Sequence, residues 1–262
     1  MTNQRKTICI TGASSGLGAA LAEIYARGKA RLVLTGRDAE RLQTVAKRCE
    51  QLGAEVHTSV LDVRARDLTQ QYLTQMDHRY PFDILIANAG ISGGMGGIDE
   101  KDIMAQGYEV FETNLTGVLH TIDPIIPRMI ARGRGHAVLM SSLVSYSPWP
   151  GAPAYAASKA AVRFYGEALA QTLKPHGVNV SVICPGFVRT PMTDRNPYRM
   201  PLLMDTEKAA RLMKAGLDKK KRLIVYPFLT AFIAQLMGMI HSSVMTHFLA
   251  KTPQKPALPD QL

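Results

Sequence analysis

Short apolar runs alternate along the chain with longer stretches in which apolar and polar residues are mixed. The runs are rich in β-branched residues, a pattern that predicts strands. The predicted strands are Thr7–Thr11, Arg31–Thr35, Glu55–Val60, Asp83–Ala87, His136–Ser141, Asn179–Cys184 and Leu223–Tyr226. Some runs, such as Ile84–Ala87, are apolar at every position, which is typical of parallel strands buried on both faces. We therefore expect an α/β fold with about seven parallel strands in one doubly wound sheet and helices on both faces.

Apolar residues recur at three-to-four spacing between the strands, and this spacing predicts helices. The predicted helices are Leu17–Arg27, Ala39–Leu52, Asp67–Arg79, Lys101–Arg132, Ala154–Lys174 and Thr206–Leu217. Thr206, followed by Glu207 in the first turn, is expected to begin the last helix. No linker rich in Pro, Gly or Ser divides the sequence. We therefore expect a single domain over residues 1–251 and a flexible tail over residues 252–262.

The composition is that of a globular protein with one large core, since 46 % of its 262 residues are hydrophobic. The net charge of +10 favours anionic partners in general, whether nucleic acid, membrane surface or small molecule. The basic residues gather in three clusters, which are Arg27 to Arg31, Arg128 to Arg134 and Lys219–Arg222. No nucleic-acid-binding motif accompanies them, so we interpret the clusters as solvated helix ends and expect no nucleic-acid partner.

Cysteine and histidine usage argues against disulfides and metals. Cys9, Cys49 and Cys184 are odd in number and widely spaced, which indicates neither a disulfide framework nor a zinc site. The 7 histidines show no metal-ligand spacing, so we expect no metal. Residues 1–6 are polar and run directly into an apolar strand, without the n-region and h-region of a signal peptide. We therefore expect a cytoplasmic protein.

A glycine-rich segment, Thr-Gly-Ala-Ser-Ser-Gly-Leu-Gly at residues 11–18, joins the first strand to the first helix. Gly12 allows a sharp turn, Gly16 allows the backbone to approach a phosphate, and Gly18 allows the helix to pack close to the sheet. The helix N-terminus then faces the anion, with Ser14, Ser15 and Leu17 beside it. The segment predicts a dinucleotide phosphate site, although a plain strand-to-helix turn has the same requirements.

This T-G-x-x-x-G-x-G spacing resembles that of the short-chain dehydrogenase/reductase family, and the resemblance covers roughly residues 6 to 192. Its further motif residues are Asp62, Val63, Asn88, Ala89, Gly90, Asn114, Ser142, Tyr155, Lys159, Pro185, Gly186, Val188 and Thr190. One position departs, because Ala87 stands where the family usually has Asn. The resemblance implies a Rossmann-type fold, a nicotinamide cofactor bound by these residues and the glycine-rich segment, and interconversion of a carbonyl and an alcohol.

Tyr155 and Lys159 lie four residues apart on a predicted helix and therefore on one face. A phenol has a pKa of about 10, which must fall by about 3 for general acid–base work near neutrality, and a neighbouring ammonium has the right sign. Ser142 lies at the carboxyl end of a predicted strand, where its hydroxyl can hydrogen-bond a substrate carbonyl. Ser141 points to the opposite side of the strand, and the resemblance places the catalytic role on Ser142.

Asn114 interrupts a long predicted helix, a position that is unfavourable for asparagine. The family resemblance gives Asn114 a role in positioning a water molecule that links Lys159 to solvent. It also implies that Lys159 holds the nicotinamide ribose.

The residues after the second predicted strand bear on the choice of cofactor. An acidic residue at this point would bind the adenosine ribose of NAD, whereas arginine favours the 2′-phosphate of NADP. Here Gly36 and Arg37 follow the strand, and Asp38 is better placed to cap the next helix. We therefore expect NADP(H) to be preferred over NAD(H).

Residues 191–222 are expected to form a substrate lid, since Met, Leu and Pro are frequent in Pro191–Asp205. An ordinary covered loop is the alternative. Trp149 and the prolines around it, between Ser142 and Tyr155, add apolar surface. Together they favour an apolar or amphiphilic carbonyl or alcohol substrate over a small charged acid.

The stretch Leu223–Ala250 contains no Asp, Glu, Lys or Arg. Pro227, Gly238 and other polar or helix-breaking residues interrupt it, so we predict a strand plus an apolar helix and not a membrane span. A subunit interface, a wall of the substrate pocket and an anchor on anionic lipid through residues 219–250 all remain possible. We favour self-association as a homodimer or homotetramer, which the family resemblance also implies.

Two alternatives to a carbonyl/alcohol oxidoreductase remain. One is a catalytically silent NADP-binding regulator, which would not need Ser142, Tyr155 and Lys159 together. The other is a reductase that works at a membrane surface on a lipid-like substrate.

Overall fold

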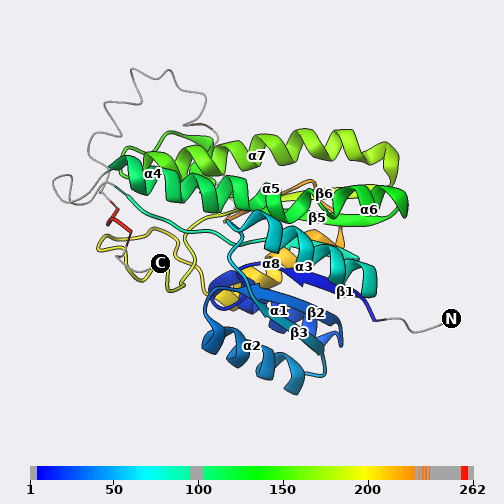
Figure 1. Cartoon of the computed structure of the whole chain (residues 1–262). Coiled ribbons are helices and arrows are strands. Elements are labelled where there is room, and N and C mark those ends of the chain that lie inside the picture. The colour runs from blue at the N-terminus through cyan, green and yellow to red at the C-terminus, as the bar shows by residue number, and fades with distance from the viewer. Residues whose placement is uncertain are drawn as a thin grey trace.

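The computed structural model describes residues 5–94, 103–227, 230, 232, 234, 236 and 255–258. Within these residues, seven parallel strands form one sheet in the order β3-β2-β1-β4-β5-β6-β7 (Figure 1). The strands are β1 Thr7–Ile10, β2 Arg31–Gly36, β3 Glu55–Val60, β4 Ile84–Ala87, β5 Gly135–Met140, β6 Val178–Pro185 and β7 Leu223–Tyr226. The predicted Rossmann-type α/β fold and its parallel sheet are confirmed.

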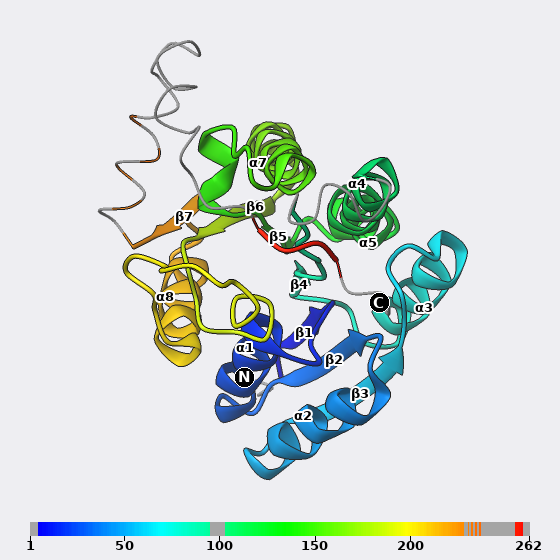
Figure 2. The same cartoon turned by 90° about the vertical axis from the view of Figure 1, so that its left-hand side faces the viewer.

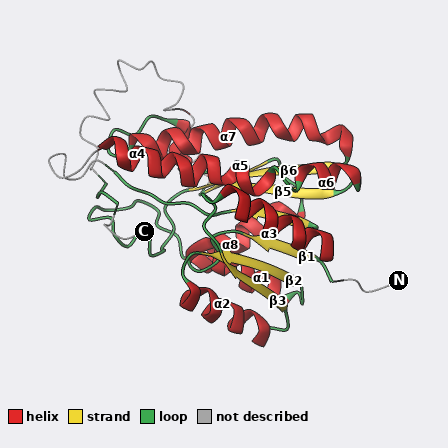
Figure 3. Cartoon of the chain, in the orientation of Figure 1, coloured by secondary structure: helices red, strands yellow, loops and turns green. Residues whose placement is uncertain are grey.

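Helices cover both faces of the sheet (Figures 2 and 3). The helices are α1 Gly16–Arg27, α2 Ala39–Gln51, α3 Arg66–Arg79, α4 Ile103–Phe111, α5 Gly117–Ile122, α6 Ile126–Ala131, α7 Pro153–Leu173 and α8 Thr206–Asp218. Helices α1, α2 and α8 lie on one face, and α3, α5, α6 and α7 lie on the other. The arrangement gives two hydrophobic cores with the sheet between them.

Successive side chains of each strand point to opposite faces of the sheet, so the strands in the middle of the sheet contribute residues to both cores. On β1, Ile8 and Ile10 belong to the core under α1, α2 and α8, whereas Cys9 belongs to the core on the other face. All three side chains have no exposed surface. Because successive residues of a strand point to opposite faces, an apolar run without interruption is what a doubly covered strand requires.

The helix predicted over Lys101–Arg132 is wrong as one element, and its first two residues lie outside the described residues. A π-helical turn at Glu112–Thr116 separates α4 from α5, and a turn separates α5 from α6. Pro124 lies in that second turn, where its ring and missing N–H prevent the helix from continuing. Pro127 is tolerated because it lies in the first turn of α6.

Smaller differences affect the ends of other elements by one or two residues. At α8, Asp205 occupies the N-cap position and Thr206 is the first helical residue, with its hydroxyl donating to the carbonyl oxygen of Arg189. Ala209, Ala210 and Met213 of α8 are fully buried in the core beside α1. The part of the predicted 191–222 lid that forms α8 therefore belongs to the core.

The apolar stretch Leu223–Ala250 begins with β7 at the predicted residues. The apolar helix predicted after it lies mostly outside the described residues. At two described positions, Phe232 and Leu236 expose 51 % and 41 % of their surface. In the described part of the chain, no helix combines the length and the apolar character needed to cross a membrane.

Candidate active site

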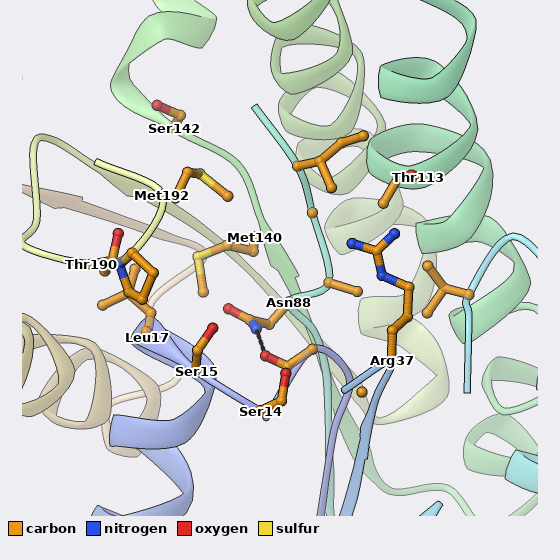
Figure 4. Close-up of a pocket in the computed structure, with 18 of the residues that line it drawn as sticks. Ser14, Ser15, Leu17, Arg37, Asn88, Thr113, Met140, Ser142, Thr190 and Met192 are labelled. Atoms are coloured by element: carbon orange, nitrogen blue, oxygen red, sulfur yellow. Dashed lines mark hydrogen bonds between the residues drawn. The ribbon is translucent and has the colours of Figure 1, made fainter. Parts of the chain in front are cut away.

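A cavity of about 630 Å³ lies at the carboxyl ends of the strands, where the sheet order reverses between β1 and β4. This is the position at which open parallel sheets bind ligands. In Figure 4, Ser14 and Ser15 lie at the base of the cavity, Thr190 and Met192 on one side, and Arg37 and Thr113 on the other. Loops after six strands therefore converge on one site.

Most of the site residues predicted from the sequence line this cavity. They are Gly12, Ser14, Ser15, Gly16, Leu17, Arg37, Asp62, Val63, Asn88, Ala89, Gly90, Ser142, Tyr155, Lys159, Pro185, Gly186, Val188 and Thr190. Gly18 and Asn114 do not line it. The roles assigned to all these residues stay predictions, but their convergence is a property of the fold.

The glycine-rich segment is held against the end of β4. The Asn88 amide Nδ2 donates to the carbonyl oxygens of Thr11 and Gly12, at 2.9 and 3.0 Å. Gly12 has φ +65°, and a Cβ there would lie 2.7 Å from the Ala89 Cα. A Cβ at Gly18 would lie 2.6 Å from Asn88 Nδ2, so Gly18 allows close packing without lining the cavity.

The N-terminus of α1 is suited to an anion. Ser15, the N-cap residue, makes no side-chain capping hydrogen bond and lines the cavity. Gly16 has φ +55°, which directs the backbone into the first turn without a side chain in the way. Backbone N–H groups and the helix dipole therefore favour a phosphate beside residues 14–17.

Arg37 and Asp38 follow β2 at the far end of the cavity. The Asp38 carboxylate caps α2 by accepting a hydrogen bond from the Arg41 N–H at 2.9 Å, which confirms the capping role predicted for it. Arg37 is exposed at the cavity edge. The first side chain after β2 at this end of the cavity is therefore a cation, and the neighbouring carboxylate is engaged as a helix cap.

Asp62 is paired with Arg64 instead of standing free in the cavity. Arg64 donates to the Asp62 carboxylate from its backbone N–H and from its guanidinium, at 2.7 to 2.9 Å. Burial raises the pKa of Asp62, but these hydrogen bonds and the positive charge of Arg37 outweigh it and hold the pKa below its usual value. Asp62 is therefore an ionised residue that fixes the loop after β3.

Ser142, Tyr155 and Lys159 meet at the other end of the cavity. The Lys159 ammonium donates to the Met140 carbonyl oxygen at 3.0 Å and lies 5.9 Å from the centroid of the Tyr155 ring. Ser141 is buried and donates to the Lys159 carbonyl oxygen at 2.7 Å. Both serines line the cavity, but the Ser141 hydroxyl is engaged with the backbone of α7.

Asn114 lies behind this group in the π-helical turn. Its Oδ1 accepts from the Ile91 N–H at 2.8 Å, and its Nδ2 donates to the Ile91 carbonyl oxygen and the Ser158 hydroxyl, at 3.0 and 3.1 Å. A Cβ at Gly90 would lie 3.0 Å from Asn114 Oδ1 and 3.3 Å from Lys159 Nζ. Asn114 therefore ties the loop after β4 to α7 next to Lys159. From there it can help to hold the Lys159 side chain in position.

Residues 6–199 match the sequence model described as short chain dehydrogenase. The chain belongs to the short chain dehydrogenase family. It is therefore an oxidoreductase that acts on CH–OH or C=O groups with NAD or NADP.

Relatives of this short chain dehydrogenase agree with the assignment. An uncharacterized oxidoreductase of Myxococcus xanthus is 35 % identical over 224 residues, which is 85 % of this chain and 88 % of that protein. A Sphingobium yanoikuyae short-chain dehydrogenase in complex with NADPH has a TM-score of 0.79 and 27 % identity, covering 98 % of this chain and 100 % of its own. The bulky-bulky ketone specific alcohol dehydrogenase of Comamonas testosteroni has a TM-score of 0.77 and 26 % identity, covering 98 % of each chain.

Burial dominates the electrostatics of the dehydrogenase site. Burial raises the pKa of Tyr155, although a hydrogen bond with Ser142 acts in the opposite direction. Burial also lowers the pKa of Lys159 to about 8. General acid–base work at neutral pH calls for a lower Tyr155 pKa, whereas burial in this site raises it.

Sequence reasoning missed several residues of the dehydrogenase cavity. Those not predicted as site residues include Leu61, Ile91, Thr113 and Met140, whereas Met192 was predicted only as part of the lid. Leu61 and Met140 were detectable, because each lies at the carboxyl end of a predicted strand. Thr113 was not, since it reaches the cavity only because of the irregular turn at Glu112–Thr116.

Proposed function

We propose that this short chain dehydrogenase is an NADP(H)-dependent reductase of an apolar or amphiphilic carbonyl compound, and the corresponding alcohol dehydrogenase in reverse. One observation carries the proposal: Ser142, Tyr155 and Lys159 line the same cavity as the glycine-rich segment and Arg37. A silent regulator would not require the three catalytic side chains at that cavity. The predicted cytoplasmic location, homodimer or homotetramer, and surface association with membranes stay predictions.

The residues of the cavity fit a nicotinamide dinucleotide. Gly12, in the loop after β1, and Gly16, the first residue of α1, adopt positive φ, and a Cβ at Gly36 would lie 3.1 Å from the Ser14 side chain. These glycines allow the loops around the cavity to pack closely against one another, as the tight turn of a dinucleotide site requires. When bound, the reduced cofactor supplies hydride to the substrate carbon.

The side chains at the other end supply the remaining chemistry. The Ser142 hydroxyl donates a hydrogen bond to the carbonyl oxygen and stabilises the charge that builds there. Tyr155 gives its phenol proton to the same oxygen. Lys159, held by the Met140 carbonyl oxygen, keeps a positive charge near the phenol and favours the tyrosinate that remains.

The test of this activity is the oxidation of NADPH, followed by absorbance, with a panel of aliphatic and aryl ketones. We expect turnover by the wild type and a loss in kcat of about 10²–10³-fold in Ser142→Ala, because one hydrogen bond to the developing oxyanion is removed. Ser142→Thr keeps the hydroxyl and should recover part of the rate. Turnover by Ser142→Ala equal to that of the wild type would refute the role of Ser142, and no turnover of any ketone by the wild type would count against the proposal.

Cofactor preference is expected to depend on Arg37. Arg37→Ala removes a charged partner of the 2′-phosphate, so the Kd for NADPH should rise by about 10- to 100-fold, with a much smaller effect on NADH. Calorimetric titration of both cofactors measures this directly. Arg41→Ala is the comparison, since Arg41 also lines this end of the cavity. Discrimination that survives Arg37→Ala and is lost in Arg41→Ala would assign the preference to Arg41.

A further inference from the structure

Residues 255–258, drawn in red in Figure 2, lie beside the start of α7. The Lys255 N–H donates to the Gly151 carbonyl oxygen at 3.3 Å, and the Gly94 N–H donates to the Pro256 carbonyl oxygen at 3.0 Å. The Leu258 N–H donates to Gln106 Oε1 at 2.9 Å. These hydrogen bonds fix a segment that falls within the predicted flexible tail.

Two glycines in the loop after β4 allow this segment to pack closely against the loop. A Cβ at Gly93 would lie 2.7 Å from Leu258 Cγ, and a Cβ at Gly94 would clash with Lys255. The Arg195 guanidinium also donates to the Ala257 carbonyl oxygen at 2.9 Å. The segment is therefore held from two sides, by the loop after β4 and by the Met- and Pro-rich segment of the predicted lid.

This packing brings Lys255 to the catalytic tyrosine. The Lys255 ammonium lies 4.8 Å from the centroid of the Tyr155 ring and donates to the Ser92 hydroxyl. The Lys159 ammonium lies 5.9 Å from the same centroid. Two ammonium groups from distant parts of the sequence thus approach one phenol ring.

The charge of Lys255 has no acidic counterpart in the part of the chain that the structure describes, where no Asp or Glu forms an ion pair with it. Burial and the nearby Arg195 guanidinium lower the pKa of Lys255 to about 8. A poorly solvated cation gains strongly from an anionic partner. An anion placed beside Lys255 would therefore bind favourably next to the reacting centre.

We propose that Lys255 is a substrate-specificity residue that binds a carboxylate on the carbonyl substrate, so that the enzyme prefers oxo acids with an apolar chain. The inference rests on the proposed reductase activity and names its substrate class. The Lys255 ammonium lies 4.8 Å from the centroid of the Tyr155 ring, so a substrate whose carbonyl oxygen bonds the Tyr155 hydroxyl would bring a carboxylate a few bonds away toward this ammonium. Met192, Met140 and Ile91 provide apolar surface within the cavity.

The carboxylate of the substrate takes no part in the bond changes. The carbonyl carbon accepts hydride from the reduced nicotinamide, and the carbonyl oxygen accepts the Tyr155 proton as the C=O π bond breaks. The products are a hydroxy acid, the oxidised nicotinamide and a Tyr155 phenolate, which regains its proton from solvent. An oxo acid with an apolar chain is amphiphilic, which agrees with the substrate class expected from the sequence.

The test compares alkyl 2-, 3- and 4-oxo acids with their methyl esters, in the wild type and in Lys255→Met. For at least one chain position we expect the wild type to favour the acid over the ester in kcat/KM, and the ratio to fall by about 10- to 100-fold in Lys255→Met. Lys255→Arg should retain the preference. Lys208→Met makes the same change of charge at an exposed position on α8 and should leave the ratio as in the wild type.

The outcomes separate the two proposals. An acid-to-ester ratio that is the same in Lys255→Met and the wild type refutes the role of Lys255 and leaves the reductase activity intact. If the wild type turns over neither acids nor esters, the proposed reductase activity fails on these compounds. The role of Lys255 is then decided by calorimetric titration of decanoate into the NADPH complex of the wild type and of Lys255→Met. Binding about 10-fold weaker in Lys255→Met supports that role, and equal binding refutes it. NADPH titration of each variant identifies any that fails to fold.

Discussion

Replacement of Tyr155 by phenylalanine is expected to lower kcat by about 10³–10⁴-fold, because it removes the group that exchanges a proton with the substrate oxygen. The ring and its packing on α7 are retained, and the glycine-rich segment that would hold the cofactor phosphates is untouched. The Kd for NADPH should therefore change little. Steady-state kinetics with the best ketone found, together with calorimetric titration of NADPH, measure both quantities on the same preparation.

Tyr165→Phe is the matched control for Tyr155→Phe. Tyr165 lies on the same helix but exposes 40 % of its surface, so loss of its hydroxyl should leave kcat and the NADPH affinity as in the wild type. If Tyr155→Phe turns over at a rate comparable to Tyr165→Phe, another group supplies the proton, and the mechanism proposed for this site is wrong. A variant of Tyr155 that no longer binds NADPH would point instead to a structural role.

The parallel sheet could be predicted because the patterns that indicate it lie within short segments of the sequence. An apolar run such as Ile84–Ala87 requires cover on both faces, and glycine at positions 12, 16 and 18 constrains the turn that follows β1. The break in the helix predicted over Lys101–Arg132 was not predicted, although Asn114 was recognised as unfavourable there. Its side chain bonds the Ile91 backbone and Ser158, and such long-range contacts offset the local cost of an irregular turn.

The residues that sequence reasoning placed wrongly or left out depend on contacts between distant segments. Lys255 was assigned to a flexible tail, because no local pattern relates it to Tyr155. Arg128 and Arg132 were interpreted as solvated helix ends, since their spacing shows only that they share a helix face. In the structure both guanidinium groups bond the carboxylate of Asp77 on α3. Charge clusters in a sequence therefore do not reveal which of their members are paired.

This buried ion cluster leads to the largest stability effect that we expect. The Asp77 carboxylate is fully buried and accepts hydrogen bonds from the Phe82 N–H at 2.9 Å, from Arg128 at 2.5 Å and from Arg132 at 2.7 and 3.0 Å. Asp77→Ala leaves these donors without their acceptor, and loss of one partner of a buried ion pair costs about 3–5 kcal/mol. Arg128 and Arg132 expose 31 % and 21 % of their side chains, so water offsets part of the cost. We therefore expect about 3 kcal/mol.

Urea unfolding followed by circular dichroism measures this loss, with an unchanged m-value showing that the same surface is still exposed on unfolding. Asp218→Ala is the matched control, because it removes a carboxylate from the exposed Lys214–Asp218 pair on α8 and should cost at most about 1 kcal/mol. The difference between the two variants isolates the effect of burial. If Asp77→Ala costs no more than Asp218→Ala, the three-residue cluster that joins α3 to α6 does not stabilise this face of the sheet.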